Sequence, residues 1–200
     1  MPPWETPEDR ALALFGRRSR AGLALRRESG AVGRACHAMA GRFRRGGSLY
    51  TFGGGVAAAD AAHIAVEFVH PVIVGKRALP AVSLGCGTVP PDGSAEVFAT
   101  RLEAMAGPHD IALALSADGR CEAVLRGLEK ARERGALTVA LTGGDGGDLA
   151  RSPAVDHLIV AASDDPRVVR EMHVTVYHVL WELVHVFLER PGGLDTEVPS

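Results

Sequence analysis

The fold class of this chain follows from residues 49–60, which read Leu49-Tyr50-Thr51-Phe52-Gly53-Gly54-Gly55-Val56-Ala57-Ala58-Ala59-Asp60. A short apolar run at 49–52 meets three glycines, and a segment of helix length follows at 56–69. Similar apolar runs recur at 81–84, 111–115, 138–141 and 157–161. Further segments of helix length lie at about 94–106, 120–134, 145–151 and 166–189. Continuous apolar strands alternating with helices predict a parallel sheet covered on both faces. The expected fold is therefore α/β, a three-layer, doubly wound sheet of five parallel strands.

A pair of helices is expected before this alternation, at 8–27 and 31–45, with a break at Ser29-Gly30. Residues 1–45 hold ten arginines and four acidic residues. A basic segment can bind nucleic acid, but these arginines lie at helical spacing among alanine and leucine, without interleaved aromatic residues. We therefore expect a solvated helix face or a contact between subunits, and no nucleic-acid partner.

The composition predicts one domain over 1–200, with the helical pair at 1–45 and an α/β core at 46–190. The chain has 200 residues, of which 46% are hydrophobic and 23% charged, so it can bury a substantial core. It has no apolar run of about eighteen residues, which argues against a membrane span. The three cysteines, Cys36, Cys86 and Cys121, are odd in number and lack metal-ligand spacing. This usage fits a reduced compartment, and we expect a cytoplasmic protein.

Ligands of doubly wound sheets bind beyond the carboxyl ends of the strands, where Gly53-Gly54-Gly55 is expected to lie. Glycines there let the backbone approach an anion at the N-terminus of the following helix. Three glycines at a strand end also make an ordinary tight turn, and both interpretations stay open. Val56 interrupts the glycine spacing of a dinucleotide-binding loop.

His63 and Glu67 are four residues apart, which places both on one helix face. Such a pair can share a metal ion or a proton-transfer task, or it can be a polar pair on a solvated helix edge. In the last helix, His178 lies in the densest apolar stretch, so its imidazole most needs a partner. That helix also carries Glu171, His173, Glu182 and His185, and its histidines are expected to be core or interface residues rather than ligands.

Four stretches taken together resemble the phosphoheptose isomerase family of the SIS (sugar isomerase) type, over roughly residues 40–190. The first is Arg44-Arg45-Gly46-Gly47-Ser48-Leu49-Tyr50-Thr51-Phe52-Gly53-Gly54-Gly55, followed by Asp60-Ala61-Ala62-His63 and Glu67. The second is Leu79-Pro80-Ala81-Val82-Ser83-Leu84. The third is Arg132-Glu133-Arg134-Gly135, leading into Thr138-Val139-Ala140-Leu141-Thr142-Gly143-Gly144-Asp145-Gly146-Gly147. The fourth is Glu171-Met172-His173 with His178-Val179-Leu180-Trp181-Glu182-Leu183.

The resemblance implies an enzyme that interconverts an aldose phosphate and a ketose phosphate through an enediol, in a homotetramer with sites shared between subunits. It implies Glu67 as the base that removes the C–H proton and His178 as the acid. It also implies His63, Glu67 and His178 as three of four ligands of a zinc ion. The residues implied to bind the carbohydrate derivative are Gly53, Gly54, Gly55, Ser116, Asp118, Gly119, Arg120 and Thr142.

The sequence departs from the family at the loops that bind phosphate. Gly54 replaces an Asn, Val56 a Gly and Ala57 a Ser, and Gly85-Cys86-Gly87 replaces hydroxyl-bearing residues. The loop Ser116-Ala117-Asp118-Gly119-Arg120-Cys121 keeps one hydroxyl of the family's Ser-Thr-Ser-Gly-Asn-Ser and adds an anion. Asp118 would repel a phosphate by a few kcal/mol at about 3–4 Å, unless Arg120 pairs with Asp118 or with the ligand.

Two functions remain open from the sequence. The first is an isomerase acting on a sugar phosphate or a related sugar. The second is a non-catalytic SIS module that binds a sugar derivative or a protein partner, as in a branch of the family that serves a replication initiator. Arg170 stands at the family's fourth ligand position, where a cation opposes a metal. We therefore favour a metal-free cleft with Arg170 paired to Glu67. The apolar last helix and the leucine-rich first helix exceed what one domain can cover, so we also expect a dimer or tetramer.

Overall fold

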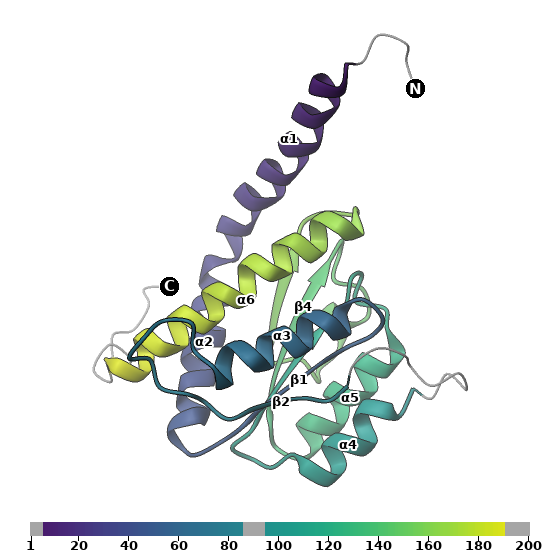
Figure 1. Ribbon diagram of the computed structural model, residues 1–200. Coiled ribbons are helices and arrows are strands. Elements are labelled where there is room, and N and C mark those ends of the chain that lie inside the picture. Colours follow the sequence, from purple (N-terminus) through teal and green to yellow (C-terminus); the bar gives the residue numbers. More distant parts are fainter. Residues whose placement is uncertain (1–5, 86–94, 191–200) are drawn as a thin grey trace.

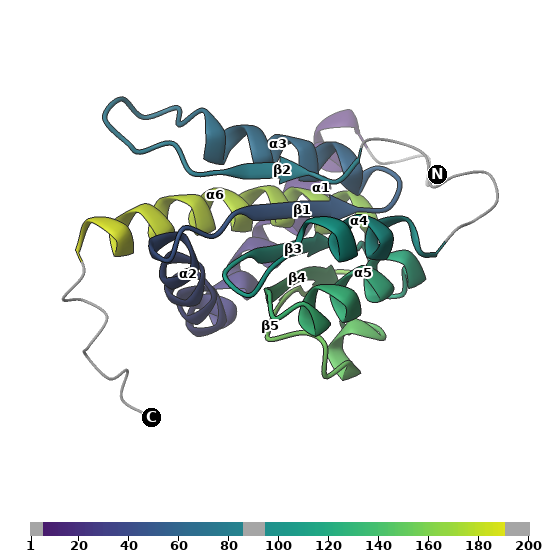
Figure 2. The ribbon, with the colours of Figure 1, turned by 90° about the horizontal axis from the view of Figure 1, so that it is seen from below.

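The computed structural model describes residues 6–85 and 95–190, which form an α/β fold around a five-stranded sheet (Figure 1). All strand pairs are parallel, and the order across the sheet is β2-β1-β3-β4-β5. Figure 2 shows the strands in this order. The strands are β1 (Leu49–Gly53), β2 (Ala81–Ser83), β3 (Ile111–Leu115), β4 (Leu137–Gly143) and β5 (His157–Ala161). The predicted fold class and the five parallel strands are confirmed.

Helices cover both faces of the sheet and make it the middle of three layers (Figure 2). On one face lie α2 (Ser29–Arg44), α3 (Ala57–Val69) and α6 (Pro166–Glu189). On the other face lie α4 (Val97–Met105) and α5 (Glu122–Glu133). In β3, Ile111, Leu113 and Leu115 point to the first face, whereas Ala112 and Ala114 point to the second. Because side chains alternate along a strand, one apolar run supplies both cores.

The first helix, α1 (Pro7–Leu25), projects from the body of the molecule (Figure 1). Among its residues only Ala21 is buried. Leu12, Phe15 and Leu23 are more than 60% exposed and lie on the helix face opposite Ala21. None of the described helices is long and apolar enough to cross a bilayer.

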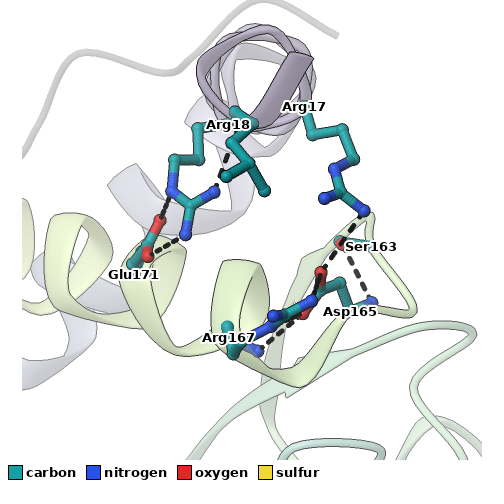
Figure 3. A network of polar contacts seen from close by, with 7 residues as sticks. Arg17, Arg18, Ser163, Asp165, Arg167 and Glu171 are labelled. Carbon is teal, nitrogen blue, oxygen red and sulfur yellow. Dashed lines mark hydrogen bonds and ion pairs between the residues drawn. The ribbon is translucent and has the colours of Figure 1, made fainter. Parts of the chain in front are cut away.

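Two arginines join α1 to the start of α6 (Figure 3). Arg18 pairs with Glu171 at 2.7 Å, and Arg17 approaches the carboxylate of Asp165 at 3.8 Å. Asp165 also caps α6 by accepting a hydrogen bond from the backbone N–H of Arg167. The arginines of the N-terminal helices therefore serve, at these two positions, as contacts to the α/β body.

The predicted helix at 145–151 and the predicted break at Ser29-Gly30 are wrong. The segment at 145–151 contains only turns and the short 3-10 helix η2 (Leu149–Arg151), because Gly144, Gly146 and Gly147 adopt positive φ angles that end an α-helix. The break between α1 and α2 is the 3-10 helix η1 (Arg26–Glu28), and Ser29-Gly30 lies inside α2. Burial of Val32, Cys36 and Met39 against the sheet keeps this end of α2 helical.

Candidate functional site

The candidate site lies between α3 and α6, which share one face of the sheet. The turn at 53–55 leads from β1 into α3 and uses glycine for two reasons. A Cβ on Gly53 would lie 2.9 Å from the carbonyl oxygen of Leu115, and Gly55 has a φ of +58°. The first amides of α3 are already paired, since the N–H groups of Ala57 and Ala58 donate to the carbonyls of Gly54 and Gly55 at 3.2 Å. These contacts favour the tight-turn interpretation of the three glycines.

His63, Glu67 and His178 converge, as the sequence predicted. The Nε2 atom of His63 lies 3.0 Å from Oε1 of Glu67, and Nε2 of His178 lies 3.7 Å from the same oxygen. The Glu67 side chain is 12% exposed, whereas the two imidazoles are nearly half exposed. The cluster therefore places one sheltered carboxylate oxygen between two imidazoles that a ligand can reach.

Two aromatic residues of α6 support this cluster. The hydroxyl of Tyr177 lies 3.2 Å from Nδ1 of His63, and the indole N–H of Trp181 donates to the backbone oxygen of Glu67 at 2.9 Å. Burial, together with the carboxylates of Asp60 and Glu67, raises the pKa of Tyr177 to about 12, so its phenol stays protonated. Sequence analysis missed both residues. The available signal was that a buried Tyr or Trp needs a partner for its O–H or N–H.

The donor set fits a divalent metal ion. Zinc–ligand distances of about 2.0–2.2 Å place the ligand atoms of a tetrahedral site about 3.3–3.6 Å apart. The two separations to Glu67, 3.0 and 3.7 Å, fall on either side of this range, and all three ligand atoms lie within 4.8 Å of one another. The contact between Tyr177 and Nδ1 of His63 leaves Nε2 as the ligand atom and fixes the ring, as partners of metal-binding histidines do.

The predicted pairing of Arg170 with Glu67 is wrong. The guanidinium of Arg170 binds Asp60 through two hydrogen bonds, from Nε at 2.8 Å and from Nη2 at 3.0 Å. Asp60 precedes Glu67 by two turns on α3, and Arg170 precedes His178 by about two turns on α6. The packing of α3 against α6 therefore places Arg170 beside Asp60 and His178 beside Glu67. This alignment of the two helices is set by tertiary packing.

His173 and His185 of α6 are buried, as expected for histidines of this helix. His178, although it lies in the densest apolar stretch, is nearly half exposed. His185 bonds through its two ring nitrogens to the backbone oxygens of Trp181 and Arg77. Burial lowers the pKa of His173, whose Nε2 has no hydrogen-bond partner within the described part of the chain. Thr142, expected to bind the ligand, is fully buried and offers a ligand no surface.

In the loop after β3, two backbone N–H donors are paired with side chains of the same loop. The backbone N–H of Gly119 donates to the hydroxyl of Ser116, and that of Arg120 donates to the carboxylate of Asp118, both at 3.0 Å. The guanidinium of Arg120 binds the two oxygens of Asp145 at 2.9 and 3.0 Å, so its carboxylate partner is neither Asp118 nor a ligand.

A cavity of about 560 Å³ opens beside this loop. Its lining carries three carboxylates, those of Asp118, Asp145 and Asp164, against the guanidinium of Arg120. The cavity is therefore poor in free donors for an anion, which agrees with the departures from the family pattern in the sequence.

Comparison with known proteins gives the family. The sequence model of the SIS domain matches residues 18–143. The chain is 38% identical over 179 residues to a phosphoheptose isomerase of Chlorobaculum tepidum, covering 85% of this chain and 83% of the relative. It is 36% identical over 163 residues to one of Solidesulfovibrio magneticus, covering 78% of each.

Solved structures show the same fold. A phosphoheptose isomerase from Francisella tularensis aligns with a TM-score of 0.82 at 24% identity, over 91% of this chain and 100% of that chain. One from Neisseria gonorrhoeae aligns with a TM-score of 0.79 at 24% identity, over 90% and 98% of the two chains. From the sequence matches, with the fold in agreement, this chain belongs to the SIS-domain family and is a homologue of the phosphoheptose isomerases within it.

Proposed function

We propose that this chain is an aldose–ketose isomerase that acts on a sugar phosphate or a related sugar. The observation that carries the proposal is the cluster of His63, Glu67 and His178, in which a sheltered carboxylate lies between two accessible imidazoles. The relatives' name, phosphoheptose isomerase, supports a phosphorylated heptose as the reference substrate.

In the proposed reaction Glu67 removes the proton from the carbon next to the carbonyl, while His178 gives a proton to the carbonyl oxygen. The product of this step is an enediol. His178 then takes the proton of the neighbouring hydroxyl, and Glu67 returns its proton to the former carbonyl carbon. The half-exposed ring of His178 can meet the substrate, and the Trp181–Glu67 hydrogen bond holds α3 and α6 in register for both groups.

We also propose that His63, Glu67 and His178 would hold a zinc ion through Nε2 of each imidazole and Oε1 of Glu67, which leaves Oε2 of Glu67 and Nδ1 of His178 for proton transfer. Two imidazoles and a carboxylate leave a fourth position open, as in catalytic zinc sites. When bound, the ion would polarise the substrate carbonyl and stabilise negative charge on its oxygen. The contact of Tyr177 with His63 supports this role, because it orients the imidazole that faces Glu67.

A second candidate is a non-catalytic module that binds a sugar derivative. The observation that favours it is the loop at 116–121, where Ser116 and Asp118 accept from the amides of Gly119 and Arg120. A loop paired in this way has fewer donors for a phosphate, although the Glu67 cluster is intact.

The experiment that separates the two follows exchange of the substrate's C–H proton with deuterated solvent by NMR. Sedoheptulose 7-phosphate and unphosphorylated sedoheptulose are each incubated with the protein. An enzyme exchanges the proton even where net turnover is slow, and we expect Glu67→Gln to lower the exchange rate by about 10²–10⁴-fold.

The matched control is Glu182→Gln, which changes an exposed acid of α6 outside the cluster. It should leave the exchange rate unchanged. Binding of either sugar without exchange in the unaltered protein would refute the isomerase and support the binding module.

A further inference from the structure

The ion pair of Asp60 and Arg170 lies beside the candidate site and is strongly fixed. Its two hydrogen bonds, at 2.8 and 3.0 Å, join the fork of the guanidinium to both carboxylate oxygens. The Asp60 side chain is 7% exposed, whereas Arg170 is 49% exposed. Bidentate pairs of this kind fix orientation as well as contributing energy. A buried carboxylate therefore holds an otherwise accessible cation in one direction.

The guanidinium of Arg170 lies on the same pair of helices as the His63–Glu67–His178 cluster and contributes to the charge around it. Asp60 lies three residues before His63 on α3, so the two side chains are neighbours on the helix surface. Arg170 lies seven residues, about two turns, before Tyr177 on α6, and both side chains reach α3, where Arg170 binds Asp60 and Tyr177 contacts His63. Asp60 and Glu67 carry two negative charges and Arg170 one positive charge, so the local balance favours a cation by one charge. Without Asp60 this balance is zero, and Glu67 is the carboxylate left for the guanidinium to approach.

We propose that Asp60 is a positioning residue that holds Arg170 away from Glu67 and so keeps the His63–Glu67–His178 cluster able to bind a divalent cation. This inference rests on the metal site of the proposed function. Asp60 cancels the charge of Arg170. The chain can therefore carry a cation at the family's fourth ligand position and still keep the other three metal ligands.

A purely structural role would give a different pattern of effects. If the pair only fastened α3 to α6, removing either partner would weaken the cluster alike. If Asp60 restrains Arg170, then Asp60→Asn is harmful, Arg170→Gln is harmless, and Arg170→Gln rescues Asp60→Asn. This asymmetry separates restraint of a cation from fastening of two helices.

The test is a Co²⁺ titration of metal-free protein, followed by the visible absorption of the bound ion. Four proteins are compared: unaltered, Asp60→Asn, Arg170→Gln and the double variant. We expect Asp60→Asn to weaken Co²⁺ binding by about 10–100-fold, the range for residues that support metal ligands. The double variant should return to within about twofold of Arg170→Gln. Thermal unfolding of each variant checks that the fold is retained.

Asp165→Asn is the matched control, because it removes a carboxylate from another arginine pair of α6 at a distance from the cluster. It should leave Co²⁺ affinity unchanged. Equal affinity of the unaltered protein and Asp60→Asn would overturn this inference alone. So would equal weakening of Asp60→Asn and the double variant. A lack of Co²⁺ binding by the unaltered protein would overturn the metal site as well.

Discussion

His173 is enclosed between α6 and the sheet, where burial lowers the pKa of its imidazole. Above the ordinary histidine pKa of about 6.5, the ring is neutral in both the folded and the unfolded chain. Below that pH the unfolded chain binds a proton that the folded chain resists. The free energy of unfolding should therefore fall as the pH drops below about 6.5.

This pH dependence can be assigned by comparing the protein with His173→Gln, which cannot take up the proton. Urea unfolding at pH 7.5 and at pH 5.5 should show a smaller loss of stability in the variant. Carboxylates titrate in both proteins, so the difference between them isolates the histidine. Parallel losses in the two proteins would mean that His173 binds its proton equally well when folded.

Single residues also show where sequence reasoning reaches its limit. The cluster of His63, Glu67 and His178 was predictable because a helical spacing and a family resemblance pointed to the same residues. The partner of Arg170 was not, because the choice between Asp60 and Glu67 depends on how α3 slides along α6. The exposure of His178 was also missed, since an apolar run of helix does not reveal which of its faces meets the sheet.

The loop between β3 and α5 is expected to bind phosphate poorly. Asp118 accepts a hydrogen bond from the amide of Arg120 and adds an anion to the loop that the family resemblance implies for phosphate, so we expect turnover of sedoheptulose 7-phosphate to be weak or absent. Replacing Ala117, Asp118 and Cys121 with Thr, Ser and Ser removes this anion and adds three hydroxyl donors. We expect the affinity for inorganic phosphate to rise by about fivefold, because Asp118 is exposed to solvent and a charge repulsion at about 4 Å in water is worth about 1 kcal/mol.

Isothermal titration with phosphate measures this change. Glu103→Gln is the control, because it removes an exposed carboxylate that pairs with Lys130 away from the loop. Turnover of sedoheptulose 7-phosphate by the unaltered protein at the level of its relatives would show that the loop binds phosphate despite Asp118.

The strands were predictable as elements because each is a continuous apolar run with turn residues at its ends. The segment at 145–151 was not, although its length suits a helix. The local signal for turns was the set of glycines at 144, 146 and 147, which adopt positive φ angles. The pairing of Asp145 with Arg120, 25 residues away, also holds this segment and could not be predicted from local composition.

At the scale of the whole molecule, we expect a dimer or tetramer in which α1 is an interface. Its residues Leu12, Phe15 and Leu23 form an exposed apolar stripe on the face opposite Ala21. A groove of about 260 Å³ between the N-terminal helices and α6, lined in part by Leu25 and Val179, is also apolar. Exposed apolar stripes of this kind usually mark a contact with another chain.

Light scattering at micromolar concentration measures the mass. The double variant Leu12→Lys, Phe15→Lys should shift the protein toward a smaller species, because it places two charges in the stripe. Ala13→Lys, an exposed neighbour beside the stripe, should leave the mass unchanged. A clean monomer of the unaltered protein would refute an interface on α1.

The position of His178 in the last helix has a consequence for synthesis on the ribosome. Glu67 is translated 111 residues earlier, about 6–22 seconds before His178 at about 5–20 residues per second. During that interval Ile64 and Phe68 of α3 lack the cover that α6 gives them in the finished protein. A ribosome that stalls before residue 166 therefore releases a chain with half of the proposed proton-transfer pair and with an uncovered apolar surface, which we expect chaperones and proteases to bind.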